Sequence, residues 1–225
     1  HIESLIFFYV RILRILLCKI RYLLIYNFIE TGIIRGNYMK NTACSGNGYK
    51  TAQKTERSLF TRMCIGEAII ELMQDKGMNG VNVSAIAKRS GVSRMTFYYY
   101  YDSVQEALTD YMKEIVADYL KARKNTPGLG NYQEYSHVVF SLKFFDQYKT
   151  FFLTMTQNGL HSILMDGINE FMLSYLPKET IQSLYDIYYY AGGLLNTFLK
   201  WEENGQKGKD AEEVAESSAS IPGLG

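Results

Sequence analysis

The residues whose types and spacing indicate the most specific chemistry lie in the segment 82–108, NVSAIAKRSGVSRMTFYYYYDSVQEAL. Before its last tyrosine this segment carries three cationic side chains, those of Lys88, Arg89 and Arg94, and no carboxylate. A polyanion can therefore approach it without local repulsion. An arginine can also bind the O6 and N7 atoms of guanine, and a threonine methyl group can pack on thymine. The pattern indicates a segment that binds DNA.

Two short helices and a turn must position these side chains. Asn82 and Ser93 are typical N-cap residues, and each precedes a short helical pattern. Gly91 lies between the two patterns and can adopt a positive φ, so the chain can turn sharply there. We expect Ile86 to face inward in the first helix and the second helix to span 94–101. Because a major groove admits one α-helix, such a unit can present its second helix to DNA.

Longer helices are predicted on both sides of this unit. Apolar residues recur at three- and four-residue spacing from Thr55 until Gly77, which is a candidate C-cap. Another helix is expected to start near Ser103 and to continue to about Lys124. After a break at 126–128, the helices expected in the second half are 132–148, 150–157, 162–175, 178–204 and 210–217, with Gly205 ending the fourth of these. No alternating strand pattern occurs, so the predicted fold is all-α.

Composition narrows the class of protein. The 225 residues suffice for one or two small domains, and 24 lysines and arginines against 23 acidic residues produce no strong overall field. Cys18, Cys44 and Cys64 are odd in number and far apart, which indicates reduced thiols in a cytoplasmic protein. His137 and His161 lack partners at metal-ligand spacing, so we interpret both as structural and expect no metal. Paired carboxylates, a Cys–His dyad, a phosphate loop and a Ser–His–Asp order are all missing, so we expect neither an enzyme nor a cofactor.

The first 38 residues differ from the rest, because arginines and a lysine interrupt a nearly continuous apolar sequence. One interpretation is an interfacial or membrane-anchoring helix, although the longest uncharged apolar run is far shorter than a spanning helix. The other is translated upstream sequence ahead of a start at Met39. Residues 39–54 are polar and basic, and we interpret them as a flexible arm, either a solvated tail or a groove-binding segment.

The segment 82–108 resembles the DNA-binding domain of the TetR family of bacterial regulators. The matching residues are Ile86-Ala87, Gly91-Val92-Ser93, Thr96-Phe97-Tyr98, Tyr100-Tyr101 and Leu108. The resemblance implies that Phe97 and Tyr101 enter a small core. With Lys88 and Arg89 added for their charge, the predicted DNA-binding residues are Ser84, Lys88, Arg89, Arg94, Met95, Thr96, Tyr98 and Tyr100.

Within this set, Arg94 and Thr96 are the candidates for base contacts, and Tyr98 for a phosphate contact. Two positions depart from the family pattern. Val104 stands where family members usually carry a phosphate-binding lysine, so one such contact is missing or replaced. Met95 stands where many members have a small or polar residue, so it contacts a thymine methyl group or alters the approach of the helix.

The end of the chain resembles one C-terminal type of the same family, which dimerises through its last helices. Gly192 and Gly193 destabilise a helix and are best explained by the close approach of another helix. The candidate dimer residues are Tyr188, Gly192, Gly193, Leu195, Phe198 and Trp201; packing within one chain is the alternative. Aromatic and methionine side chains could also line an effector pocket, or simply form the core. The candidate pocket residues are Phe144, Tyr148, Phe151, Phe152, Met155, Met165, Met172, Tyr175 and Tyr185.

The predicted organisation is a helix-turn-helix domain at 55–110 and a helical effector-binding and dimerisation domain at 111–220. The predicted function is a homodimeric transcription regulator, a repressor, that binds a palindromic operator and is released or altered by a small effector. Its expected partners are double-stranded DNA, a second copy of the chain, and an apolar or aromatic effector. No membrane partner is expected unless residues 1–38 belong to the native protein. A ligand-independent DNA-binding scaffold of the same fold is the alternative.

Overall fold

The computed structural model describes residues 47–175, 184–206 and 210–219. The chain divides into two compact units, 1–55 and 56–225, and every helix after the first turns of α2 belongs to the second. Residues 1–38 and the first part of the predicted arm lie outside the described residues. Every element of the described ranges is helical, without a strand, which confirms the all-α fold class. In these ranges no helix combines the length and apolar character needed to span a membrane.

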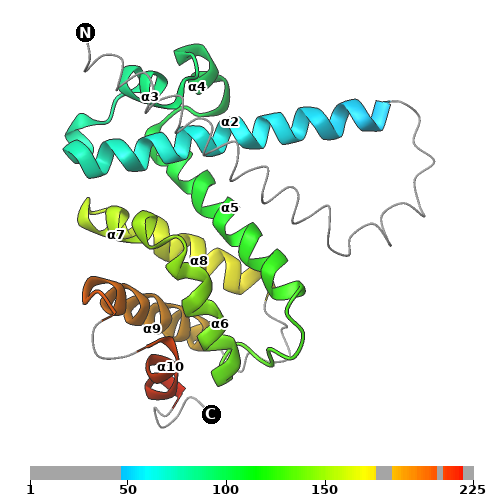
Figure 1. The fold of residues 1–225 in the computed structure, drawn as a ribbon, viewed down its shortest axis with the longest axis vertical. Coiled ribbons are helices and arrows are strands. Elements are labelled where there is room, and N and C mark those ends of the chain that lie inside the picture. The colour runs from blue at the N-terminus through cyan, green and yellow to red at the C-terminus, as the bar shows by residue number, and fades with distance from the viewer. Residues whose placement is uncertain (1–46, 176–183, 207–209, 220–225) are drawn as a thin grey trace, which may run out of the picture. The chain divides into compact units, whose positions relative to one another are not determined.

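The helices largely follow the predicted boundaries (Figure 1). In chain order they are α2 (Asn47–Lys76), the 3-10 helix η2 (Met78–Gly80), α3 (Val83–Ser90), α4 (Arg94–Tyr100), α5 (Val104–Lys124), α6 (Tyr135–Asp146), α7 (Lys149–Gln157), α8 (His161–Tyr175), α9 (Leu184–Glu203) and α10 (Ala211–Ala219). Two differences stand out. α2 begins at Asn47, within the segment predicted to be an arm, and η2 was not predicted at all.

Side-chain caps fix the starts of α3, α4 and α5. The side-chain oxygens of Asn82, Ser93 and Ser103 each accept a hydrogen bond from the backbone N–H three residues further on, at 3.0, 3.0 and 3.1 Å. These bonds satisfy donors that have no partner inside the helix. Gly91 ends α3 with φ of 78°, a left-handed conformation that a side chain would disfavour. The predicted caps and turn are thus confirmed.

A small apolar core holds α2, α3 and α4 together against the start of α5. Phe97 is fully buried and Tyr101 is 4% exposed, as predicted. They lie in one buried cluster with Ile69 of α2, Ile86 of α3 and Leu108 of α5. Because these side chains come from all four helices, the direction of α4 is set by the packing of its neighbours.

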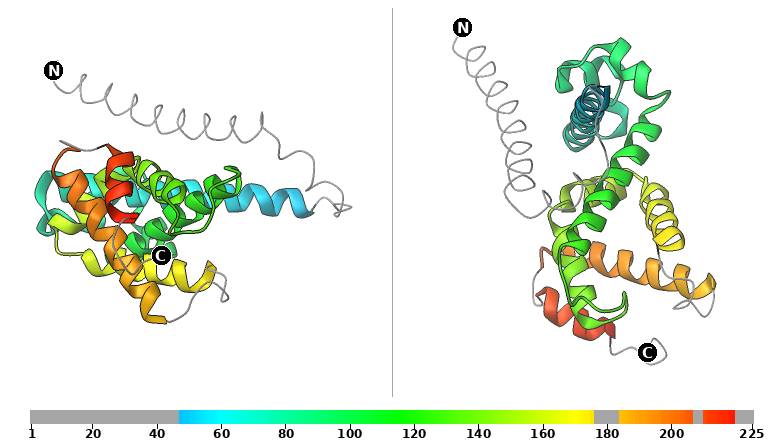
Figure 2. Two further views of the ribbon diagram at one scale, coloured as in Figure 1. Left: turned by 90° about the horizontal axis from the view of Figure 1, so that it is seen from below. Right: turned by 90° about the vertical axis from the view of Figure 1, so that its right-hand side faces the viewer.

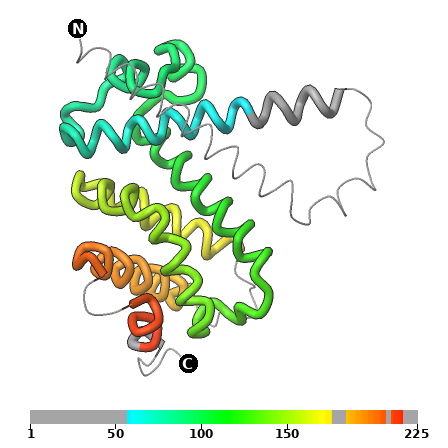
Figure 3. The backbone as a smooth tube through the Cα atoms, in the orientation of Figure 1, coloured from blue at the N-terminus to red at the C-terminus, as the bar shows by residue number. Residues whose placement is uncertain are grey.

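The remaining helices form a second layer built around α8. α8 packs against α5 on one side and α9 on the other, α7 lies against α8 and α9, and α10 packs on α6. The views in Figure 2 show α5 leaving the α2–α4 helices and continuing along the later ones, and the tube of Figure 3 follows the same path to α6. One helix therefore belongs to both parts of the fold.

Close contacts join these two parts. The Tyr111 ring of α5 lies against Gly66 of α2 on one side and has its centroid 5.3 Å from that of Phe151 of α7. Beyond α7, the side-chain oxygen of Asn158 accepts a hydrogen bond from the backbone N–H of Met78 at 3.0 Å. The turn after α2 is therefore held by a residue from the second half of the chain.

We predict that Gly66→Ala destabilises the protein, because the added methyl group would lie 2.8 Å from Cγ of Tyr111 and the ring or α2 would have to move. The expected cost is about 1–3 kcal/mol in the free energy of unfolding, measured by urea denaturation. In a Tyr111→Leu background the same substitution should cost clearly less, because the ring is gone. Equal costs in both backgrounds would contradict this contact.

Candidate nucleic-acid interface

The surface of α4 is formed by one cationic, one apolar and two aromatic side chains. Met95, Tyr98 and Tyr99 are 84%, 60% and 75% exposed, and Arg94 is exposed at the first position of the helix. No described residue forms a hydrogen bond or ion pair with the Arg94 side chain. These large side chains on a helix only seven residues long remain available to a partner.

Tyr99 was not among the predicted contacts, whereas Tyr100 was. The structure exposes Tyr99 more than Tyr100, whose ring packs on Tyr99 with a centroid distance of 4.9 Å. The signal was present in the sequence. If Phe97 and Tyr101 face the core four residues apart, the residue midway between them must point away from it.

Thr96 and Ser84 lie at helix starts. The Thr96 hydroxyl is 2.8 Å from the hydroxyl of Ser93, so it is tied into the cap of α4. Its methyl group remains the part that can meet a base. Ser84 is exposed near the start of α3, and Val104 is partly buried against the core at the start of α5. The side chain at the Val104 position thus contributes packing, and no charge.

Arg89 differs from the other two predicted cations. Its guanidinium donates hydrogen bonds to Glu71 at 3.0 Å and to Asp75 at 2.7 Å, both on α2. These bonds raise the pKa of Arg89 above its usual value. Residues 82–101 contain no carboxylate, but α2 supplies two. The positive charge that can attract a polyanion therefore rests mainly on Lys88 and Arg94, which among the described residues form no ion pair.

Asp110 of α5 ties the end of α4 to α2. Its carboxylate accepts hydrogen bonds from Nη1 of Arg62, 2.6 Å from each oxygen, and from the Tyr101 hydroxyl at 2.5 Å. The other guanidinium nitrogen of Arg62 binds Glu114 at 2.8 Å. Burial, and then the bond to Asp110, raises the pKa of Tyr101, so this hydroxyl stays protonated as a donor. Three helices meet at one charged, partly buried cluster.

A capped glycine turn, a short helix with exposed side chains and two supporting helices define the helix-turn-helix class of DNA-binding proteins. Residues 65–106 match the sequence model of the bacterial regulatory proteins of the tetR family. These helices are a TetR-family DNA-binding domain, and the family predicted from the sequence is confirmed.

Solved structures with a similar fold include two regulators that are distant in sequence. A TetR transcriptional regulator from Streptococcus agalactiae 2603V is 17% identical with a TM-score of 0.51, and the match covers 76% of this chain and 97% of that one. The fatty acid degradation regulator FadR from Bacillus halodurans is 17% identical with a TM-score of 0.50, covering 70% of this chain and 92% of that one. At this identity the likeness concerns the fold. No protein of curated function shows a significant sequence match.

The candidate pocket residues divide into three groups in the structure. Five are buried in the core: Phe144, Phe151, Phe152, Met155 and Met172. Tyr148 and Met165 are partly buried against that core. Tyr175 and Tyr185 are exposed, at 55% and 80%. The aromatic stretch thus forms mainly packed interior, and the pocket interpretation stays a prediction.

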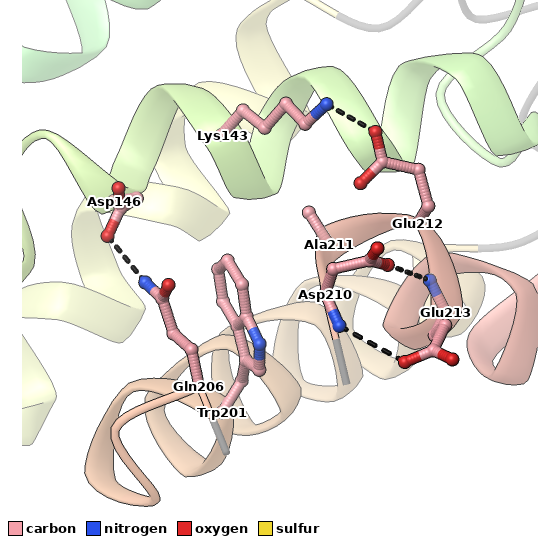
Figure 4. A pocket seen from close by; sticks show the side chains of 8 residues that line it. All are labelled: Lys143, Asp146, Trp201, Gln206, Asp210, Ala211, Glu212 and Glu213. Atoms are coloured by element: carbon pink, nitrogen blue, oxygen red, sulfur yellow. Dashed lines mark hydrogen bonds and ion pairs between the residues drawn. The ribbon is translucent and has the colours of Figure 1, made fainter. Parts of the chain in front are cut away.

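A cleft of about 430 Å³ lies elsewhere, among α6, α9 and α10 (Figure 4). Its polar groups mostly bind one another: Lys143 pairs with Glu212, and Gln206 donates to Asp146 at 2.7 Å. Asp210 and Glu213 exchange hydrogen bonds with each other's backbone N–H. These groups close the end of the bundle.

α9 carries an exposed stripe along one side. Tyr185, Tyr188, Tyr189, Gly192 and Gly193 are spaced by three and four residues, so they lie on one face of the helix. The three tyrosines are 80%, 43% and 63% exposed. A methyl group built on Gly193 meets no described atom within 4 Å. No described helix of this chain therefore explains the glycine.

The other candidate dimer residues lie behind this stripe. Leu195 and Phe198 are 2% and 3% exposed and belong to the core of one chain. Trp201 is partly buried, with its ring centroid 6.5 Å from that of Phe198. These three side chains support α9 from inside, whereas Tyr188 and Gly193 face outward. Gly192 is partly buried, and a methyl group built on it would lie 4.0 Å from Cε of Met165 on α8.

We predict that Arg89→Ala lowers stability, because it leaves Glu71 and Asp75 without the cation that joins α3 to α2. These ion pairs are partly exposed, so the expected loss is about 0.5–1 kcal/mol in the free energy of unfolding, measured in urea. Lys88→Ala removes the neighbouring cation and serves as the matched control, with little or no expected change. Equal effects of the two substitutions would contradict the structural role of Arg89.

Proposed function

We propose that this protein is a homodimeric transcription regulator that binds a palindromic operator through α4 and is released or altered by a small effector. The observation that carries the proposal is the exposed Arg94–Tyr99 surface of α4, within a domain that matches the TetR family. The sign of regulation that we propose is repression, with the protein acting in the cytoplasm. Binding DNA, and no catalysis, is the proposed activity.

The proposed contacts divide the side chains of α4 and α3 by chemistry. Arg94 binds a guanine edge in the major groove, and the methyl groups of Met95 and Thr96 pack on thymine. The hydroxyls of Tyr98 and Tyr99 donate to phosphates, which fix the register of the helix without reading sequence. Ser84 and Lys88 of α3 bind the sugar-phosphate backbone of the DNA next to α4. Tyr100 supports the Tyr99 ring.

Dimerisation brings two such helices to one duplex. We propose that the Tyr188, Gly192 and Gly193 face of α9 packs on its copy in a second chain, because glycines permit helices to approach closely. A two-fold interface uses the same face twice, which suits a single stripe. The two α4 helices would then enter successive major grooves roughly 34 Å apart on a palindrome.

The test of this function is a selection of binding sites from random duplex DNA with the purified full-length chain. We expect a palindromic site, and loss of discrimination at one base position of each half-site in Arg94→Ala, by about 1–3 kcal/mol with non-specific binding largely kept. Lys88→Ala, the matched control, should instead weaken binding to all sequences and reduce its salt dependence. A uniform loss in Arg94→Ala would contradict base recognition, and failure to enrich any site would contradict the function.

The dimer is tested by Gly193→Gln, which improves helix propensity in an isolated chain but fills the space over the stripe. We expect a monomer by sedimentation velocity, unchanged helix content and at least tenfold weaker operator binding. Ser162→Gln adds the same side chain at an exposed position of α8 and should leave the dimer intact. A dimer that survives Gly193→Gln would show that α9 does not form the interface.

A further inference from the structure

A cluster of polar side chains is buried between helices near the C-terminal end of α5. This is the end of α5 that lies away from the DNA-binding domain. The Tyr119 hydroxyl is 2.7 Å from Nε2 of His137 and 2.9 Å from the hydroxyl of Ser141. His137 is fully buried, and burial lowers its pKa, so the ring is neutral near pH 7. Nδ1 of His137 lies 3.4 Å from the carbonyl oxygen of Gly130. The polar groups of Tyr119, His137 and Ser141 thus find hydrogen-bond partners within the protein.

Tyr132 is the member of the cluster whose hydroxyl lacks a hydrogen-bond partner among the described residues. Only 9% of it is exposed, and its hydroxyl is buried. Its ring lies against His137, with centroids 4.5 Å apart. A buried hydroxyl left without a partner costs about 1–3 kcal/mol. Such a group calls for an acceptor that the described part of the chain does not supply.

A cation lies over the face of the ring that carries this hydroxyl. The guanidinium carbon of Arg123 is 4.4 Å from the centroid of the Tyr132 ring. Arg123 is only partly exposed, and in the described ranges it forms no ion pair with a carboxylate. The guanidinium fork matches the oxygens of carboxylates and phosphates. The Arg123 guanidinium lies over the Tyr132 ring, and neither it nor the Tyr132 hydroxyl has an oxygen acceptor among the described residues. Both groups therefore favour the same kind of ligand group, an anionic oxygen acceptor.

Aromatic rings continue from this point toward the surface. The centroid of Phe171 is 6.1 Å from that of Tyr132, and Tyr175 stacks on Phe171 at 5.8 Å. Tyr175, at the end of α8, is 55% exposed. The rings provide apolar contact for a ligand body whose polar end reaches Arg123 and Tyr132.

We propose that Arg123 and the Tyr132 hydroxyl bind the head group of an amphipathic anion, a carboxylate or phosphate monoester attached to an apolar chain or ring, and that this anion is the effector. The identity of the effector rests on the proposed regulatory function. The binding site itself rests on two donors that have no acceptor among the described residues. It differs from the predicted aromatic pocket, most of whose residues are core.

The site lies beside two helices, one that supports the DNA-binding helix α4 and one that carries the proposed dimer interface. Arg123 and Tyr119 belong to α5, whose first turns hold α4 through Asp110. The backbone carbonyl of Tyr132 accepts a hydrogen bond from the hydroxyl of Tyr190 on α9, the proposed dimer helix. A ligand that repositions Tyr132 or Arg123 therefore acts on the connecting helix and on the dimer helix together.

The site is tested by titration calorimetry of the full-length protein with octanoate, octyl phosphate and 1-octanol, which share one chain and differ in the head group. We expect at least one of the two anions to bind at least tenfold more tightly than the alcohol. The stronger of the two assigns the head group as a carboxylate or a phosphate. Tyr132→Phe and Arg123→Gln should each weaken anion binding about tenfold and leave binding of the alcohol unchanged. Lys124→Gln, which removes the adjacent exposed cation, is the control and should bind like the wild type.

Other results would overturn the site. Equal affinity for the anions and the alcohol, or unchanged anion binding in Arg123→Gln, would contradict it. Unchanged binding in Tyr132→Phe would show that the hydroxyl has another partner, such as a buried water. Thermal melts keep these outcomes interpretable, because removal of an unpartnered hydroxyl should not lower the melting temperature.

The same titrations separate this inference from the proposed function. Ligand binding is measured without DNA, and operator binding is measured both without ligand and with the tighter-binding anion. Anion binding that leaves operator affinity unchanged would contradict the effector role and leave the binding site intact. Loss of operator affinity on adding the tighter-binding anion in the wild type but not in Arg123→Gln would support both.

Discussion

The hydrogen bond from Tyr101 to Asp110 fixes a helix that is too short to be stable alone. An isolated helix of seven residues does not form in water, since each turn must first be nucleated. α4 therefore takes its direction from Phe97 in the core and from Tyr101 at its end, where Asp110 also binds Arg62. This carboxylate connects the helix that presents Arg94 to the supporting helix and to α5. The proposed contacts of α4 with DNA depend on that connection.

The elements with local signals could be predicted from the sequence. Asn82 and Ser93 cap their helices through bonds that span three residues, so the sequence next to each cap was enough to predict it. For α5 only a start near Ser103 was predicted, and Ser103 is its cap. Gly91 and the burial of Phe97 and Tyr101 were predicted for the same reason, with help from the family resemblance.

Interactions between distant segments could not be predicted in this way. Arg89 lies beside carboxylates of the preceding helix, and neither the charge count of its own segment nor its helical period reveals them. His137 was expected to be structural, which its full burial supports, but its bond to Tyr119 depends on how α5 and α6 pack. The sequence could not distinguish pocket residues from core residues for a related reason. Aromatic stripes that line a cavity and those that fill a core have the same spacing.

The contact between Asn158 and Met78 has a consequence for where the molecule can be divided. The N–H of Met78 is satisfied by a side chain eighty positions later in the chain, and Tyr111 covers Gly66 from beyond the predicted domain boundary at residue 110. A fragment cut there would lose the side-chain acceptor of the Met78 N–H and would expose to water the face of α2 that Tyr111 covers. We therefore do not expect residues 55–110, the predicted DNA-binding domain, to fold independently of the rest of the chain. The predicted domain boundary at residue 110 therefore does not coincide with a boundary of the cooperatively folding unit.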